Sequence, residues 1–191
     1  MPLFTQPPKS ICILRLSAVG DVCNALAAVQ QIQRYWPQTQ ITWLIGKTEL
    51  SLLEGLEGIE FIAVDKKQGW RGIRAIWKTL SHRRFDALLA MQTAFRASIL
   101  SLGIKAKYKI GFGRQRSREM QWLFVNRRIQ DPATPHVVDG FMAFVNDLGI
   151  PAAAPVWRLP PSEQDLAFAR QFICPTQKNL IIAPCSSKAE K

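Results

Sequence analysis

Residues 11–22 read ICILRLSAVGDV and decide the fold, because an apolar run is followed at once by a polar turn and a helical pattern. Residues 11–16 are apolar except for Arg15, which is typical of a central strand in a parallel sheet. We expect Gly20 to let the backbone turn sharply and Asp21, an N-cap residue type, to open a helix. Open α/β sheets bind ligands beyond the carboxyl ends of their strands. Residues 17–21 are therefore the first place to look for chemistry.

Apolar runs and helical patterns alternate along the rest of the chain. Further strands are predicted at residues 41–46, 59–64, 86–92 and 108–112. Helices are predicted at residues 47–56, from 71 onward, at 93–102 and from 136 to near Gly149, with loop and helix over 113–126. This order predicts an α/β fold: a Rossmann-like, doubly wound parallel sheet with right-handed crossovers.

A second domain is predicted to begin after a proline- and alanine-rich linker at residues 150–155. Beyond it, residues 162–172 have a polar helix opening and residues 180–184 read as a strand. A strand cannot stand without partners, so we expect a domain at 1–155 and an incomplete, truncated one at 156–191.

Composition narrows the class of protein. The 191 residues carry 25 Lys and Arg against 14 Asp and Glu, a net charge of +11, which predicts an anionic partner. No apolar run approaches the roughly 20 residues that span a bilayer, and no signal-peptide pattern is visible, so we expect a cytoplasmic protein. The four cysteines show no C-x-x-C spacing, which predicts reduced thiols and neither a zinc site nor disulfides.

Several segments together resemble one family. The resemblance lies in residues 15–22, in residues 86–92 ending at Gln92, in Gly111-Phe112 leading to Arg118-Glu119, in His136, and in residues 183–191. These segments are similar to glycosyltransferase family 9, the heptosyltransferases of lipopolysaccharide inner-core synthesis. The resemblance implies the N-terminal half of a GT-B architecture, in which two Rossmann-like domains face a cleft. It also implies an inverting enzyme that needs no metal or cofactor, with ADP-heptose as donor and a phosphorylated or acidic glycolipid as acceptor. We expect this chain alone to be an inactive fragment.

The same resemblance assigns roles to residues of this chain. It implies that Asp21 is the general base, whereas the residues alone favour a helix cap. Arg15 is costly to bury unpaired, so it either reaches an anionic ligand, which we favour, or pairs with an internal carboxylate. The remaining acceptor contacts implied are Ser17, Ala18, Gly20, Gln92 and Arg118. The resemblance also implies that Ser186, Ser187 and Lys191 bind the donor phosphates, and Lys188 is the alternative to Lys191.

Two other interpretations of the positive charge stay open. The first is a non-catalytic, basic Rossmann-like module that binds a nucleotide or another polyanion. No G-x-G-x-x-G, P-loop or RNP-like pattern is present, so nucleic acid is not the expected partner. The second is a peripheral contact with an anionic membrane at the inner face of the inner membrane, through Trp70, Trp77 and the basic segment 66–84. For Trp77, core packing is the favoured alternative.

Overall fold

The computed structural model describes residues 2–134, 136–159 and 161–182. It divides into two compact units, Met1–Leu159 and Pro160–Lys191. Residues 156–159 pack against the rest of the first unit. The Trp157 indole donates to the Cys23 carbonyl (2.8 Å), and the Gln30 side chain makes two hydrogen bonds with the Arg158 backbone (2.6 and 2.9 Å). The first unit therefore includes the residues that follow the predicted linker.

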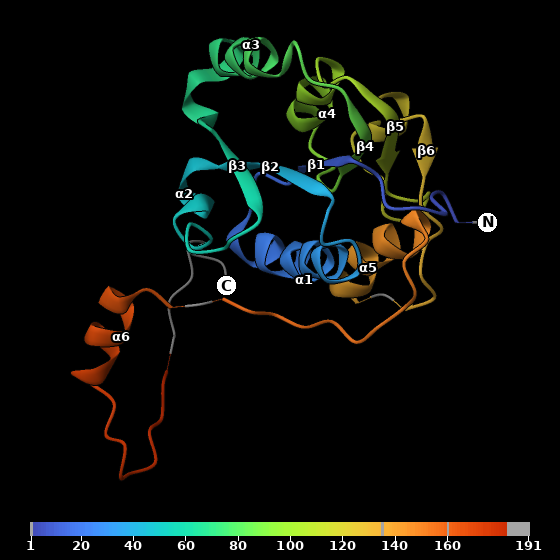
Figure 1. The fold of residues 1–191 in the computed structure, drawn as a ribbon. Helices are drawn as coiled ribbons and strands as arrows, with labels where there is room; N and C mark the ends of the chain where they lie inside the picture. Colours follow the sequence, from blue (N-terminus) through green and yellow to red (C-terminus); the bar gives the residue numbers. More distant parts are fainter. Residues whose placement is uncertain (1, 135, 160, 183–191) are drawn as a thin grey trace. The chain divides into compact units, whose positions relative to one another are not determined.

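A six-stranded parallel sheet forms the centre of the first unit (Figure 1). Its strands are β1 (Ser10–Leu14), β2 (Gln40–Gly46), β3 (Ile59–Val64), β4 (Phe85–Ala90), β5 (Ala106–Gly111) and β6 (Arg127–Arg128). Their order is β3-β2-β1-β4-β5-β6, and Ile11 of β1 stands opposite Ile41 of β2 on one side and Ala87 of β4 on the other. The predicted doubly wound sheet is confirmed, with β1 at its centre. The short strand β6 was not predicted.

Helices cover both faces of this sheet (Figure 1). They are α1 (Val19–Tyr35), α2 (Lys47–Leu50), α3 (Gly69–Leu80), α4 (Phe95–Leu102) and α5 (Val137–Leu148), with 3₁₀ turns η1 (Lys66–Gln68) and η2 (Gln121–Leu123). Side chains alternate between the faces of a strand. Ile11 and Ile13 accordingly join the core under α1 and α5, whereas Cys12 and Leu14 join the core under α3 and α4.

Three predicted elements differ in the structure. The helix expected at 47–56 is the single turn α2, followed by turns, and the 113–126 segment forms only η2 within a long loop. In the second unit, α6 (Glu163–Arg170) begins with a capping box between Ser162 and Asp165, as its polar opening predicts. The strand expected at 180–184 is absent from residues 180–182, which are exposed and pair with no strand that the structure describes. Residues 183 and 184 lie outside the described residues.

No helix in the described ranges is long and apolar enough to cross a membrane.

The backbone conformation requires glycine at position 149 but not at position 20. Gly149 ends α5 at φ +108°, and an added Cβ would lie 2.6 Å from the Phe4 carbonyl oxygen. Gly149→Ala should therefore lower the free energy of unfolding by about 1–3 kcal/mol, measured by urea denaturation. Gly20→Ala is the matched control: the residue lies in the first turn of α1 with nothing within 4 Å of the added Cβ. It should change stability by less than about 1 kcal/mol, and equal losses in both variants would contradict the argument.

Candidate active site

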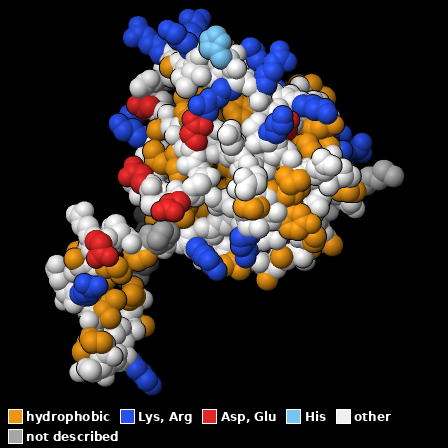
Figure 2. Space-filling view, viewed as in Figure 1, with side chains coloured by type: hydrophobic (Ala, Val, Ile, Leu, Met, Phe, Trp, Pro, Cys, Tyr) orange, Lys and Arg blue, Asp and Glu red, His pale blue; other side chains and the backbone are white. Residues whose placement is uncertain are grey.

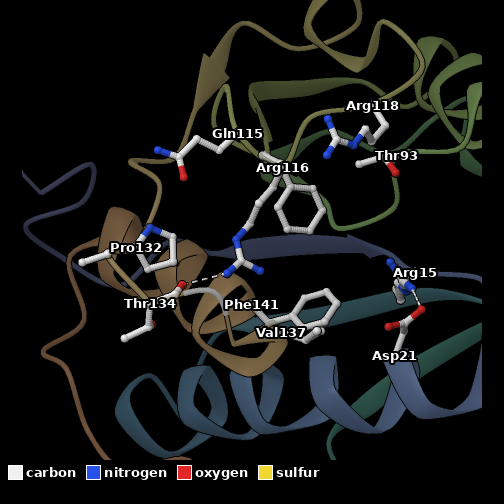
Figure 3. A pocket seen from close by; sticks show the side chains of 12 residues that line it. Arg15, Asp21, Thr93, Gln115, Arg116, Arg118, Pro132, Thr134, Val137 and Phe141 are labelled. Atoms are coloured by element: carbon white, nitrogen blue, oxygen red, sulfur yellow. Dashed lines mark hydrogen bonds and ion pairs between the residues drawn. The ribbon is translucent and has the colours of Figure 1, made fainter.

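A cavity of about 550 Å³ opens at the carboxyl edge of the sheet, where the strand order reverses between β1 and β4 (Figure 3). This is the position at which doubly wound sheets bind ligands. The loops after β1, β4, β5 and β6 and the start of α5 all contribute to its wall. The lining residues are Arg15, Asp21, Thr93, Phe112, Gln115, Arg116, Arg118, Pro132, Ala133, Thr134, Val137 and Phe141.

Arg15 and Asp21 form an ion pair on the wall of this cavity (Figure 3). The Arg15 side chain is 11 % exposed, and the Asp21 side chain is 41 % exposed. Arg15 also donates to the Met91 carbonyl (2.7 Å), and its guanidinium lies 5.4 Å from the centre of the Phe141 ring. Of the two arrangements considered for Arg15, the structure contains the pair with an internal carboxylate. That pair faces the cavity.

Burial lowers the pKa of Arg15 from its ordinary value, and the charge and hydrogen bond of Asp21 act in the opposite direction. Arginine nevertheless remains protonated in proteins. The Arg15 Nε is buried without a hydrogen-bond partner among the described residues. The ion pair uses Oδ2 of Asp21, so Oδ1 is the oxygen that a ligand hydroxyl can meet.

The expected cap by Asp21 and the expected turn at Gly20 are both wrong. Helix α1 begins at Val19, with Ala18 at its N-cap and no side-chain cap bond. Gly20 and Asp21 therefore lie inside the first turn, and Gly20 does not have a positive φ. The N-cap of α1 thus lies three residues earlier than predicted, and the Asp21 carboxylate pairs with Arg15 instead of capping the helix. Its place in the first turn still puts a negative charge at the positive end of the helix.

Gln92 lies beside this site but is not among the residues that line the cavity. Its Oε1 accepts from the Leu16 amide (2.6 Å), and its Nε2 lies 3.4 Å from the Ser17 hydroxyl. Ser17, Ala18 and Gly20 form the link from β1 into α1 and do not line the cavity either. The structure thus places the predicted base Asp21 and the predicted acceptor contacts Arg15 and Arg118 on one cavity, whereas Gln92 hydrogen-bonds the backbone just after β1.

Two arginines reach the cavity from the loop after β5 (Figure 3). Arg116 donates to the carbonyls of Thr134 and His136 (both 3.0 Å), and an added Cβ on Gly140 would lie 2.6 Å from its Nη1. Arg118 is exposed and makes no side-chain hydrogen bond or ion pair within the part of the chain that the structure describes. Arg118 is therefore free to bind an anionic group, whereas Arg116 is held in place by the backbone.

Gln121 supports the site and was missed in the sequence. It is 1 % exposed, donates to the carbonyls of Ala90 (2.8 Å) and Gln92 (2.9 Å), and accepts from the Phe112 amide (3.1 Å). Its single side chain thereby joins the ends of β4 and β5. A glutamine in a loop between exposed Met120 and Trp122 gives no periodic signal that would single it out.

Other predicted residues are placed as follows. His136 caps α5, its Nδ1 accepting from the Val138 amide (3.3 Å). Trp77 packs against the core and donates to the Leu100 carbonyl (2.9 Å), as the favoured alternative predicted. Ser186, Ser187 and Lys191 lie outside the described residues. Within the described ranges, no group of three His, Cys, Asp or Glu side chains is arranged to hold a metal ion.

A doubly wound parallel sheet with a cavity at its switch point defines an α/β domain of the class that binds ligands at that edge of the sheet. The model of glycosyltransferase family 9 (heptosyltransferase) matches residues 73–191. The chain belongs to this family.

Individual relatives agree with this assignment. The chain is 66 % identical over all 191 residues to the lipopolysaccharide core heptosyltransferase OpsX of Haemophilus influenzae, and spans 55 % of that protein. Two solved structures have the same fold. The Escherichia coli heptosyltransferase WaaC with ADP has a TM-score of 0.68 and 23 % identity, over 78 % of this chain and 51 % of that one. The family 9 glycosyl transferase of Veillonella parvula has a TM-score of 0.74 and 21 % identity, and the match covers 90 % of this chain and 49 % of that one. The chain thus spans about half the length of its relatives.

Proposed function

We propose that this chain is the acceptor-binding half of an inverting, metal-independent glycosyltransferase. The transferred sugar is heptose, the donor is ADP-heptose and the acceptor is the lipopolysaccharide inner core. The identity of 66 % to an enzyme named as a lipopolysaccharide core heptosyltransferase supports the choice of substrates. The observation that carries the proposal is the position of Asp21, a half-exposed carboxylate on the wall of a cavity at the switch point of the sheet.

In this proposal, Asp21 acts as the general base. An acceptor hydroxyl in the cavity gives its proton to Oδ1 of Asp21 while its oxygen attacks the anomeric carbon of the heptose. The bond from that carbon to the diphosphate breaks, ADP leaves with the bonding electrons, and the configuration at the carbon inverts. Arg15 holds Oδ2 of the same carboxylate and so fixes its orientation.

The arginines of the cavity bind the negatively charged groups of the acceptor in this proposal. Arg118 is free to bind a phosphate or carboxylate group, and a guanidinium binds either one through two parallel hydrogen bonds. We propose that Ser186, Ser187 and Lys191 meet the donor phosphates, with most of the donor site formed by the remainder of the protein. The isolated 191-residue chain should accordingly bind acceptor without turnover.

Transfer by the full-length protein tests this proposal. Incubation with ADP-heptose and a heptose-free inner-core glycolipid should release ADP and increase the acceptor mass by one heptose. The same mixture without acceptor is the control for donor hydrolysis. The proposal is wrong if no sugar is transferred from ADP-heptose while RNA is bound more tightly than the acidic glycolipid. That outcome would favour the non-catalytic polyanion-binding module.

A further inference from the structure

The outward face of α3 carries a basic stripe beside an exposed tryptophan. Trp70 is 62 % exposed, and Arg71, Arg74 and Lys78 are exposed as well. At 3.6 residues per turn these four side chains fall within about 100° of arc on the helix. The opposite side of α3 packs into the core, so the stripe faces away from the sheet.

The basic side chains of this stripe have no partners within the protein. Arg71, Arg74 and Lys78 make no ion pair and no side-chain hydrogen bond with any residue that the structure describes. Residues 66–84 contain seven Lys and Arg and no Asp or Glu. Figure 2 shows Lys and Arg side chains gathered over the part of the molecule where Figure 1 places α3. This charge is available to an external anion.

An apolar slot adjoins the basic stripe at Trp70. The slot has a volume of about 210 Å³ between α3 and α4 and is lined by Gly69, Trp70, Ile73, Phe95, Arg96 and Ile99. Phe95 is itself 43 % exposed, and Arg96 of α4 donates to the Lys66 carbonyl (3.1 Å) in η1, the turn that precedes α3. Helices α3 and α4 begin after β3 and β4 end, so the slot lies at the same edge of the sheet as the cavity.

We propose that the α3 face binds the surface of an anionic phospholipid bilayer, with Arg71, Arg74 and Lys78 on the headgroups and Trp70 at the interface. Lysine and arginine are attracted to anionic leaflets, and tryptophan favours the boundary between headgroups and acyl chains. A nucleic acid would match the charge and could stack a base on Trp70, but the largely apolar slot beside Trp70 and Phe95 favours the acyl boundary of a bilayer. The inference goes beyond the proposed function, because none of these residues lines the catalytic cavity.

Vesicle sedimentation of the purified protein tests the lipid preference. The protein should sediment with vesicles that mix phosphatidylglycerol and phosphatidylcholine and stay in solution with pure phosphatidylcholine. Binding should weaken as salt rises, because charges at a surface are screened. Equal binding to both kinds of vesicle would overturn the proposal.

Charge reversal locates the surface. The double variant Arg71→Glu and Arg74→Glu should weaken binding to the anionic vesicles by about tenfold or more, since two attractive charges become repulsive. The matched control, Lys9→Glu and Arg128→Glu, makes the same change in net charge at exposed sites outside α3 and should bind within about threefold of the wild type. An equal loss in both double variants would show an effect of net charge alone and would reject the α3 face.

A variant of Trp70 and an RNA competitor distinguish a bilayer from a nucleic acid as the partner of this surface. Trp70→Ser should reduce the binding that remains at high salt, and circular dichroism should show that every variant keeps its fold. A short RNA is added as a competitor. If RNA displaces the protein from vesicles at a lower concentration than soluble phosphatidylglycerol headgroup analogue, and if that RNA binding depends on Arg71 and Arg74, the surface binds nucleic acid and the proposal is wrong.

Discussion

Replacing Asp21 with asparagine in the full-length enzyme should lower kcat by about 10²–10⁴-fold, the usual contribution of a general base. Asparagine has nearly the shape of aspartate and keeps an oxygen that can accept from Arg15, so the guanidinium is not left without a partner. It cannot take the proton of the acceptor hydroxyl. Heptose transfer from ADP-heptose, measured at saturating acceptor, reports the loss, and the acceptor KM should change much less.

The control for this variant is another acid in the first turn of a helix. Glu163→Gln at the start of α6 removes the same charge from an exposed position that does not line the cavity, and its rate should equal that of the wild type. Thermal unfolding of both variants shows whether lost activity reflects lost structure. If kcat of Asp21→Asn stays within about threefold of the wild type, the base is another group.

The topology of this fold was readable because its signals are local and repeated. Each apolar run is followed by a helical pattern, and right-handed crossovers leave few ways to arrange such units. The run at residues 11–16 has a single charge, which indicated burial on both faces, and the side chains of β1 do enter the core on both faces of the sheet. Strand β6 was missed because two arginines carry no apolar signal, and they join the sheet only through pairing with Ile110 and Gly111.

The details of the site depend on contacts between segments far apart in the chain. The sequence placed Arg15 and Asp21 on either side of one turn. Their pairing depends on where α1 begins, and the guanidinium is also held by the Met91 carbonyl after β4. Gln92 was predicted to contact the acceptor, but its Oε1 accepts a hydrogen bond from the Leu16 amide at the end of β1. A local sequence pattern does not predict such contacts between distant segments. The predicted strand is absent from residues 180–182 for a related reason, since a strand is stable only where another strand pairs with it.

Replacing Gln121 with alanine should lower the free energy of unfolding by about 2–4 kcal/mol, because three backbone groups lose their buried partner at once. The Ala90 and Gln92 carbonyls would lose a donor, and the Phe112 amide would lose an acceptor. Urea denaturation followed by circular dichroism measures the change. Activity should also fall, since the same side chain fixes the loops that carry Thr93 and Arg118 to the cavity.

The matched variant is Gln130→Ala, an exposed glutamine whose side chain makes no hydrogen bond to any described residue. It should leave stability within about 0.5 kcal/mol of the wild type. Gln121→Leu separates packing from hydrogen bonding, because leucine fills a similar volume but cannot bond the three backbone groups. If Gln121→Leu is as stable as the wild type, the hydrogen bonds of Gln121 contribute nothing to the fold, and its effect on activity must come from its shape alone.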